Sequence, residues 1–276
     1  MATVASIGDL AAALAHLRRF DLAQSWHAGM PHYPTHPPYT HSLTKLHGDF
    51  VLPNGASSAA DSISLGTHTG THIDALCHFS CGGALYGGAA VEDAQDWTAG
   101  IGVHAVQTLP LLLHPGVLLD VAAVRGEDAV PEDLGIGADL LERAAAYAGA
   151  HLGPGSVALI RTGWGRFWLQ PRRFINGLQL PGVTLEGAHW LSDRGAVAVG
   201  SDTVAFERMP SPCMDVHVHL LVECGIPIME CLQLEELAAA RPAEFVFLAT
   251  PLKLTGATGS PLRPYALVSE PACITA

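Results

Sequence analysis

From residue 101 onward, short apolar runs alternate with segments whose apolar residues recur at helical spacing. This spacing predicts helices at 139–150, 184–194 (with Thr184 as its N-cap), 216–224 and 234–239. The apolar runs predict strands at 102–108, 117–121, 156–161, 196–199, 226–229, 244–249 and 266–268. Because such alternation is typical of α/β layering with buried strands, we expect an α/β fold.

The N-terminal part of the chain has a different character. A helix is expected at 7–19 and a strand at 61–67, but residues 25–60 between them hold prolines at 31, 34, 37, 38 and 53. Proline at this density disfavours regular structure, so an irregular arm is predicted. It is either a binding loop or lid or an arm that packs on a neighbouring subunit. No repeat or linker divides the chain, and residues 1–276 are expected to form a single domain.

Composition limits the partners of this chain. Hydrophobic residues make up 49% of the 276 residues and charged residues 14%, which favours a large core over disorder. The net charge of −12, with no basic run, argues against nucleic acid and anionic membranes as partners. There is no run of about 20 apolar residues that would span a membrane. None of the six cysteines has the spacing of a zinc finger or redox motif, so we expect reduced thiols in a cytoplasmic protein.

The chemistry is concentrated in the segment 66–79. If this segment is extended, alternation of side chains places His68, His72 and Asp74 on one face. Gly70 leaves room on that face for a cation to approach. Two imidazoles and a carboxylate are typical ligands of zinc, manganese or iron at an open catalytic site.

His78 follows this set and is expected to act as a base beside a bound water and not as a ligand. A helical segment is disfavoured by two glycines and three threonines. A turn-rich loop whose histidines merely cap backbone groups is the remaining structural alternative.

The segment resembles the signature His-x-Gly-Thr-His-x-Asp-x-x-x-His of the cyclase family of metal-dependent hydrolases, which includes bacterial kynurenine formamidases and isatin hydrolases. The resemblance implies that His68, His72 and Asp74 bind a divalent metal and that His78 transfers protons. Leu76 departs from the proline that many members have there. Further matching pieces span about residues 60–268 and lie at 159–164, 200–203, 251–254 and 259–263.

The resemblance also implies the family's swivelling β/β/α fold, a mixed sheet flanked by helices, and assembly into homodimers or homotetramers. Arg161 and Asp202 match family positions but are equally suited to ion-pair or turn roles. A Pro-aromatic-Pro element that lines the family's substrate pocket matches at Pro31–Pro34, with Tyr33 as the aromatic residue; Thr35 and His36 replace the usual Gly-Asp.

The second half of the site is expected between 214 and 231. The family register selects His217, with His219 as the alternative, and Glu230 at the end of an apolar strand. A carboxylate is costly in such a place unless it is paired or bound to metal, although a strand-end glutamate in water is the other interpretation. By resemblance, His217 and Glu230 complete a cluster for one or two ions, Mn²⁺ or Zn²⁺. Glu223 is expected on a solvent face.

These residues predict a metal-dependent hydrolase of small amides or lactones, in which His78 or Glu230 takes the proton from a water. We favour a cyclic, isatin-like substrate over N-formylkynurenine. The long arm suggests an enclosed pocket, and before the motif only Lys45, Arg18 and Arg19 could pair with an amino-acid carboxylate. Kynurenine formamidase is the alternative; a non-catalytic metal-binding protein, or an isomerase or dehydratase, are alternatives of other classes.

Overall fold

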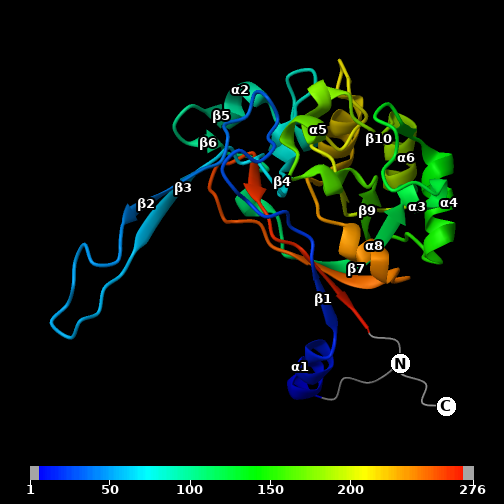
Figure 1. The fold of residues 1–276 in the computed structure, drawn as a ribbon. Coiled ribbons are helices and arrows are strands. Elements are labelled where there is room, and N and C mark those ends of the chain that lie inside the picture. Colours follow the sequence, from blue (N-terminus) through cyan, green and yellow to red (C-terminus); the bar gives the residue numbers. More distant parts are fainter. Residues whose placement is uncertain (1–5, 270–276) are drawn as a thin grey trace, which may run out of the picture.

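The structure is a computed structural model that describes residues 6–269 (Figure 1). Its centre is a nine-stranded mixed sheet with the order β1-β15-β13-β7-β9-β11-β12-β4-β14. The strands are β1 (Arg18–Asp21), β4 (His72–Asp74), β7 (Leu112–Asp120), β9 (Val157–Arg161), β11 (Ala198–Ser201), β12 (Ile228–Glu230), β13 (Phe245–Ala249), β14 (Gly259–Pro261) and β15 (Tyr265–Val268). The predicted α/β class and mixed sheet flanked by helices are confirmed.

The four central strands β7, β9, β11 and β12 run parallel, while the strands on either side pair antiparallel. Parallel neighbours need crossover connections, usually helical. The connection from β7 to β9 supplies α4 (Ala138–Ala148), and that from β9 to β11 supplies α6 (Leu185–Asp193). The connection from β11 to β12 supplies α7 (Asp215–His217) and η6 (Val218–Cys224). Thr184 caps α6 as predicted, since its hydroxyl accepts a hydrogen bond from the Gly187 N–H at 3.3 Å.

Both faces of the central strands are buried, which explains their continuous apolar sequences. Successive side chains on a strand point to opposite faces. On β9, Ala158 and Ile160 pack in the core under α4 and α6. Val157 and Leu159 pack in a second core with residues of α8 (Glu235–Ala240). A third cluster around Trp164 and Phe174 lies by α5 (Pro171–Ile175).

Shorter elements complete the fold. The remaining α-helices are α1 (Ile7–Ala15), α2 (Val91–Ala94) and α3 (Val121–Arg125). Single turns of 3₁₀-helix are η1 (Leu76–His78), η2 (Tyr86–Gly88), η3 (Val106–Thr108), η4 (Trp164–Phe167) and η5 (Asn176–Leu178). Two-residue strands form the pairs β5 (Gln95–Asp96) with β6 (Gly100–Ile101), and β8 (Gly135–Ile136) with β10 (Gly182–Val183).

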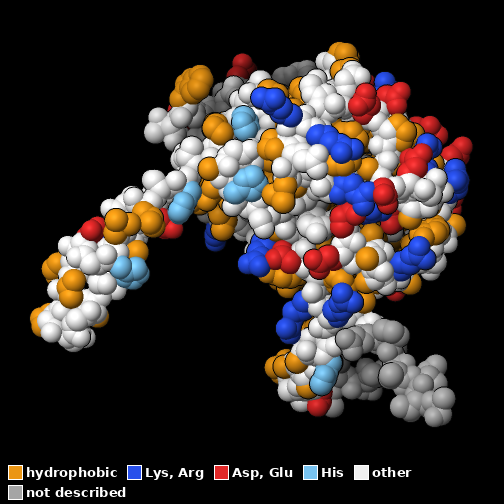
Figure 2. All heavy atoms as spheres, in the orientation of Figure 1, with side chains coloured by type: hydrophobic (Ala, Val, Ile, Leu, Met, Phe, Trp, Pro, Cys, Tyr) orange, Lys and Arg blue, Asp and Glu red, His pale blue; other side chains and the backbone are white. Residues whose placement is uncertain are grey.

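The predicted irregular arm is partly a regular hairpin. Residues 25–39 hold neither helix nor strand, but β2 (Thr40–Lys45) pairs antiparallel with β3 (Ala60–Ser64). The hairpin projects far from the body of the molecule (Figures 1 and 2). The prediction failed here because four of the five prolines precede residue 40 and the fifth lies between the strands, so β2 and β3 are free of proline.

The helix expected at 7–19 is shorter than predicted. It ends at Ala15, and Arg18 and Arg19 belong to β1, which pairs with β15.

Two other expectations are wrong. Residues 102–108 do not form a strand: His104 has a positive φ of 57° and the segment ends in η3. Its apolar side chains Ala105 and Val106 are buried without any pairing in the main sheet. The strand expected at 61–67 ends at Ser64, and a turn follows.

Two simpler expectations can also be compared with the described residues. Among residues 6–269, no helix has both the length and the apolar character needed to cross a membrane. The five cysteines in that range are free, and Cys273 lies outside the described residues.

Candidate metal centre

Strand β4 carries two of the predicted ligands and lies between β12 and β14. Ile73 packs into the core below the sheet, so its neighbours His72 and Asp74 point to the opposite face. Pairing with β12 sets Glu230 directly across from His72. The register of three short strands therefore brings together residues that are far apart in the sequence.

The turn before β4 places His68 beside this strand. Only 72–74 of the predicted extended segment form a strand, and residues 67–71 are turn and bend. Gly70 has a φ of +72°, and a Cβ atom there would lie 2.5 Å from the Trp26 indole nitrogen. Gly70 is therefore required by the turn and by the close approach of Trp26, and not to give a cation access as predicted. The turn still brings His68 Nδ1 to 2.6 Å from Asp74 Oδ1.

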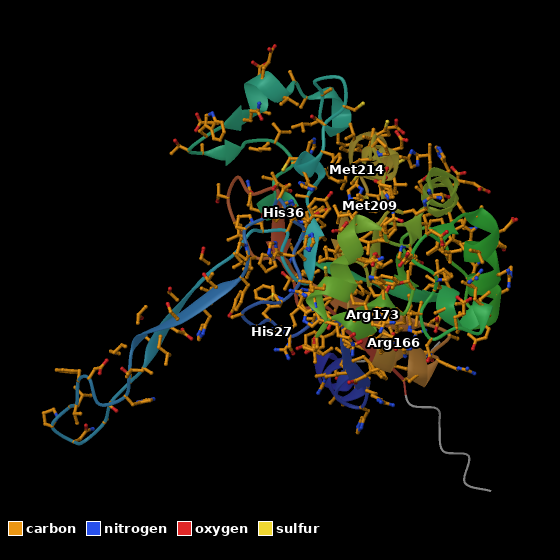
Figure 3. All side chains as sticks on the ribbon, turned by 45° about the horizontal axis from the view of Figure 1, so that its top comes forward. His27, His36, Arg166, Arg173, Met209 and Met214 are labelled. Atoms are coloured by element: carbon orange, nitrogen blue, oxygen red, sulfur yellow. The ribbon has the colours of Figure 1, made fainter. Side chains whose placement is uncertain are left out.

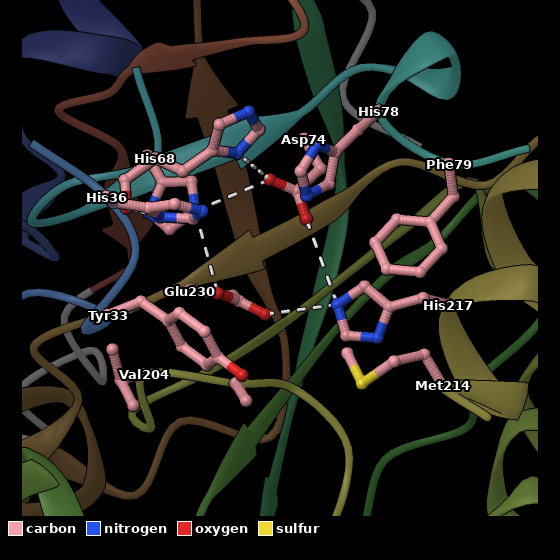
Figure 4. Close-up of a pocket in the computed structure, with 12 residues that line it drawn as sticks. Tyr33, His36, His68, Asp74, His78, Phe79, Val204, Met214, His217 and Glu230 are labelled. Carbon is pink, nitrogen blue, oxygen red and sulfur yellow. Dashed lines mark hydrogen bonds and ion pairs between the residues drawn. The ribbon is translucent and has the colours of Figure 1, made fainter. Parts of the chain in front are cut away.

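Two histidines direct Nε2 toward the same pair of carboxylates (Figure 4). His72 donates its Nδ1–H to the Gly70 carbonyl at 2.7 Å, so its Nε2 lone pair faces Asp74 Oδ1 at 3.4 Å and Glu230 Oε2 at 3.5 Å. His217 donates Nδ1–H to Glu207 at 2.5 Å, and its Nε2 faces Glu230 Oε1 at 3.4 Å and Asp74 Oδ2 at 4.0 Å.

Lone pairs and carboxylates that face each other in a buried place repel unless a cation lies between them. His72, Asp74, His217 and Glu230 are each at most 6% exposed. Burial lowers the pKa of His217, but its hydrogen bonds to Glu207 and Glu230 outweigh burial and raise the pKa to about 10. The cluster thus favours positive charge, as a proton or as a metal ion.

The spacing of these donors fits a divalent ion. Ligand atoms about 2.1 Å from a tetrahedral ion lie about 3.4 Å from one another. Three of the four Nε2-to-carboxylate distances, at 3.4, 3.5 and 3.4 Å, match this separation, and the fourth is longer at 4.0 Å. Imidazole nitrogen and carboxylate oxygen are also the donor types that zinc and manganese accept.

His78 lies closer to the ligands than the sequence suggested. Within residues 6–269 two groups have metal-ligand spacing, one of His68, Asp74 and His78 and one of His72, Asp74 and Glu230. Asp74 belongs to both groups. The His78 ring stacks on His68 with centroids 3.9 Å apart. Burial lowers the pKa of His78 to about 3, despite the opposing charge of Asp74.

The structure separates the site residues from other candidates. It brings His217 to the cluster, whereas His219 is hydrogen-bonded to Glu223 at 2.8 Å and Ser192 at 2.9 Å. The Glu223 side chain is 59% exposed, as expected. Arg161 and Asp202 also lie outside the cluster. Arg161 pairs with Asp120 and Glu235, and Asp202 accepts hydrogen bonds from the Thr162, Gly163 and Gly165 backbone.

Several contributing residues were not predicted. Glu207 fixes His217, and the Thr258 hydroxyl lies 2.8 Å from His68 Nε2. Phe79 and Met214 line the cavity beside the cluster. The sequence gives no signal for Glu207 or Thr258, because both lie in irregular segments.

A cavity of about 220 Å³ opens onto the cluster. Its apolar wall consists of Tyr33, Phe79, Val204, Ala205 and Met214, and His36 lies beside Tyr33. Tyr33 therefore lines the cavity, the position that the family resemblance implied for it. The cavity takes only Tyr33 and His36 from the arm, and the β2–β3 hairpin points away from it. The hairpin thus does not enclose its own chain's site, contrary to expectation.

The fold and this buried cluster define an α/β protein with a centre suited to a divalent metal. The model of the family described as Cyclase matches residues 20–208, more than half of the chain. A crystal structure described as a novel cyclase is 30% identical, with a TM-score of 0.83 over 95% of this chain and 93% of that one. The chain therefore belongs to the cyclase family.

Named relatives include kynurenine formamidases and isatin hydrolases. The kynurenine formamidase of Paracidovorax citrulli is 26% identical over 88% of this chain and 94% of its own. Isatin hydrolase A from Ralstonia solanacearum is 26% identical, with a TM-score of 0.74 over 97% of this chain and 99% of that one. The family match starts and ends earlier than the predicted 60–268, and it does not include His217 or Glu230.

Proposed function

We propose that this chain is a metal-dependent hydrolase that opens a small cyclic amide or lactone of the isatin type. The observation that carries the proposal is the pair of imidazole Nε2 atoms of His72 and His217 directed at Asp74 and Glu230 on the floor of a small cavity. This arrangement suits one ion, or two that share Asp74, with Mn²⁺ and Zn²⁺ as the proposed metals. The proposed ligands are His68, His72, Asp74, His217 and Glu230.

A divalent ion held by these residues supplies Lewis acidity, polarising the substrate carbonyl and lowering the pKa of a water. His78 is proposed as the proton carrier, because its ring lines the cavity and stacks on His68 beside Asp74. Burial lowers the pKa of His78, so the ring is neutral and has a nitrogen free to accept a proton. It then passes that proton to the leaving nitrogen or oxygen. Glu230 is the second proposed acceptor; the Phe206 N–H holds its Oε1 at 2.8 Å.

The cavity lining favours a flat, uncharged substrate. Tyr33, Phe79 and Met214 offer apolar surface against which a ring can stack. Among the described residues that line the cavity there is no lysine or arginine. An amino-acid carboxylate would therefore meet no cationic side chain there, which favours an isatin-like ring over N-formylkynurenine.

The test compares kcat/KM for isatin and for N-formylkynurenine with the same protein at the same metal loading. We expect a clear preference for isatin. A preference for N-formylkynurenine would replace the substrate with that of the kynurenine formamidases and leave the hydrolase class intact. Metal binding without turnover of either compound would favour the non-catalytic alternative.

We also propose that the chain forms a homodimer or homotetramer through the β2–β3 hairpin. Figure 2 shows hydrophobic side chains along the projecting arm. Its exposed apolar side chains include Leu43, Leu46, Phe50, Val51, Leu52 and Ile63. A two-stranded hairpin is only marginally stable by itself in water. A second copy of the chain would bury these apolar side chains and support both arms.

A further inference from the structure

His36 lies where the arm meets the body of the molecule (Figure 3). Its backbone N–H donates to the Tyr33 carbonyl at 2.9 Å. The carbonyl of Pro37, the residue after His36, accepts hydrogen bonds from the Gly66 N–H at 3.2 Å and the Thr69 hydroxyl at 3.0 Å. These bonds tie the loop to the turn before β4, so the position of His36 over the cavity is fixed.

The hydrogen bonds of His36 determine which ring nitrogen is free. Its Nδ1 lies 3.3 Å from the His68 carbonyl oxygen. A carbonyl oxygen can only accept, so Nδ1 carries the hydrogen, and in the neutral ring Nε2 carries a lone pair. No partner for Nε2 occurs within residues 6–269, and the His36 side chain lines the cavity. An unpaired acceptor therefore borders the substrate space.

His36 is also distinct from the proposed ligands. Neither described group with metal-ligand spacing includes it. The carboxylates of Asp74 and Glu230 are directed at the histidines of the cluster. This leaves His36 as a neutral acceptor whose lone pair is not engaged by the metal cluster.

We propose that His36 Nε2 accepts a hydrogen bond from the N–H of the substrate amide. This rests on the proposed function and makes it more specific: the chain selects secondary amides over lactones and N-alkylated amides, which have no N–H to donate. A substrate without that hydrogen would leave Nε2 unpaired beside an apolar wall, a state that costs free energy. His36 is thus a specificity residue and is not required for metal binding.

Two substitutions separate this role from a purely structural one. In His36→Asn, the amide nitrogen replaces Nδ1 and can still donate to the His68 carbonyl, but nothing replaces Nε2. In His36→Gln, the amide oxygen reaches the position of Nε2, while the bond to the His68 carbonyl is lost. A purely structural role requires the hydrogen bond to the His68 carbonyl, which only His36→Asn keeps. The proposed role requires an acceptor at the position of Nε2, which only His36→Gln keeps.

The probes are isatin and N-methylisatin, compared as a ratio of kcat/KM so that their intrinsic reactivities cancel between variants. We expect His36→Asn to lower the wild-type ratio roughly two- to tenfold, mainly through KM for isatin. His36→Gln should keep a ratio near that of the wild type. An unchanged ratio in His36→Asn, or a loss confined to His36→Gln, would overturn the proposal.

Two further measurements do not depend on turnover. Long-range ¹H–¹⁵N correlation spectra of histidine-labelled protein should give the Nδ1–H tautomer for the signal that disappears in His36→Asn; the Nε2–H tautomer would contradict the proposal. If the wild type hydrolyses neither probe, the proposed function fails. Calorimetric affinities for the two probes then test His36 directly, and equal affinities in the wild type would refute its role.

Discussion

Glu207 holds His217 by two hydrogen bonds, one from the backbone N–H at 3.1 Å and one from the ring Nδ1–H at 2.5 Å. Burial would raise the pKa of Glu207, but His217 outweighs burial and lowers it. The carboxylate therefore stays ionised and fixes both the orientation and the tautomer of the ring. Partners of this kind commonly tune metal-binding histidines.

Replacing Glu207 should consequently weaken metal binding without unfolding the chain. We expect Glu207→Gln to reduce the affinity for Zn²⁺ or Mn²⁺ by roughly 10- to 100-fold, as measured by competition with a chelating dye. Glu223→Gln is the matched control, because Glu223 holds His219 in a similar way outside the cluster. Equal affinity in wild type and Glu207→Gln would show that His217 does not need this partner or is not a ligand.

Removal of the metal should abolish hydrolysis. Dialysis against a chelator is expected to eliminate turnover, and added Mn²⁺ or Zn²⁺ to restore it, because the chain's own groups cannot activate water as strongly as a divalent ion. The apo protein should also unfold at a lower temperature, since a ligand bound only to the native state stabilises that state. Full activity in protein shown to be metal-free would refute the metal-dependent mechanism.

His78→Ala tests whether this histidine carries protons or binds metal. We expect it to keep its metal near the wild-type level and to lose turnover by on the order of a hundredfold or more. His68→Ala serves as the comparison and should lose metal. Because His78 lies in a group with ligand spacing, the metal content decides the matter: loss of metal in His78→Ala would make it a ligand.

The Arg161 network should contribute to stability and not to catalysis. The Arg161 guanidinium donates to Asp120 at 2.8 Å and to Glu235 at 2.9 and 3.0 Å. Arg161→Met leaves the buried Asp120 without its cation, so the free energy of unfolding should fall by about 3 kcal/mol. Arg125→Met, which breaks only a partly exposed pair with Glu127, should cost less than about 1 kcal/mol. Urea denaturation of both variants measures the difference, and equal losses would contradict it.

Shortening the hairpin tests its role in assembly. Replacing residues 46–58 with a two-residue turn removes Phe50, Val51 and Leu52 but keeps both strands. We expect the wild type to sediment as a dimer or tetramer and the shortened chain as a monomer, because most of the apolar surface for a second copy is removed and only Leu43 and Ile63 remain. A monomeric wild type, or an unchanged assembly after shortening, would refute the proposal.

The sequence predicts best the parts of this fold that depend on local patterns. The run Val157–Arg161 is continuously apolar up to its arginine because both faces of β9 are buried, and Thr184 offers its hydroxyl at the start of α6. The strand expected at 61–67 includes most of β3, but β2 escaped prediction because it has no apolar alternation and pairs with β3 only across a long loop.

In the site, too, residues within a local motif could be predicted, and residues brought together by long-range pairing could not. His68, His72, Asp74 and His78 lie in one motif and were found from its spacing, although Gly70 bends that motif into a turn. Glu230 was found at the end of an apolar strand. Glu207 and Thr258 were not found, since only the register of distant segments brings them to the histidines.

The position of β4 between β12 and β14 also has a consequence for biosynthesis. Ribosomes extend a chain by about 5–20 residues per second, so the strand that carries His72 and Asp74 emerges many seconds before β12 and β14, which complete its pairing. Until then the segment lacks the proposed ligands His217 and Glu230, which come later in the chain. We therefore expect metal binding to be a late event, coupled to the pairing of β4 with β12 and β14.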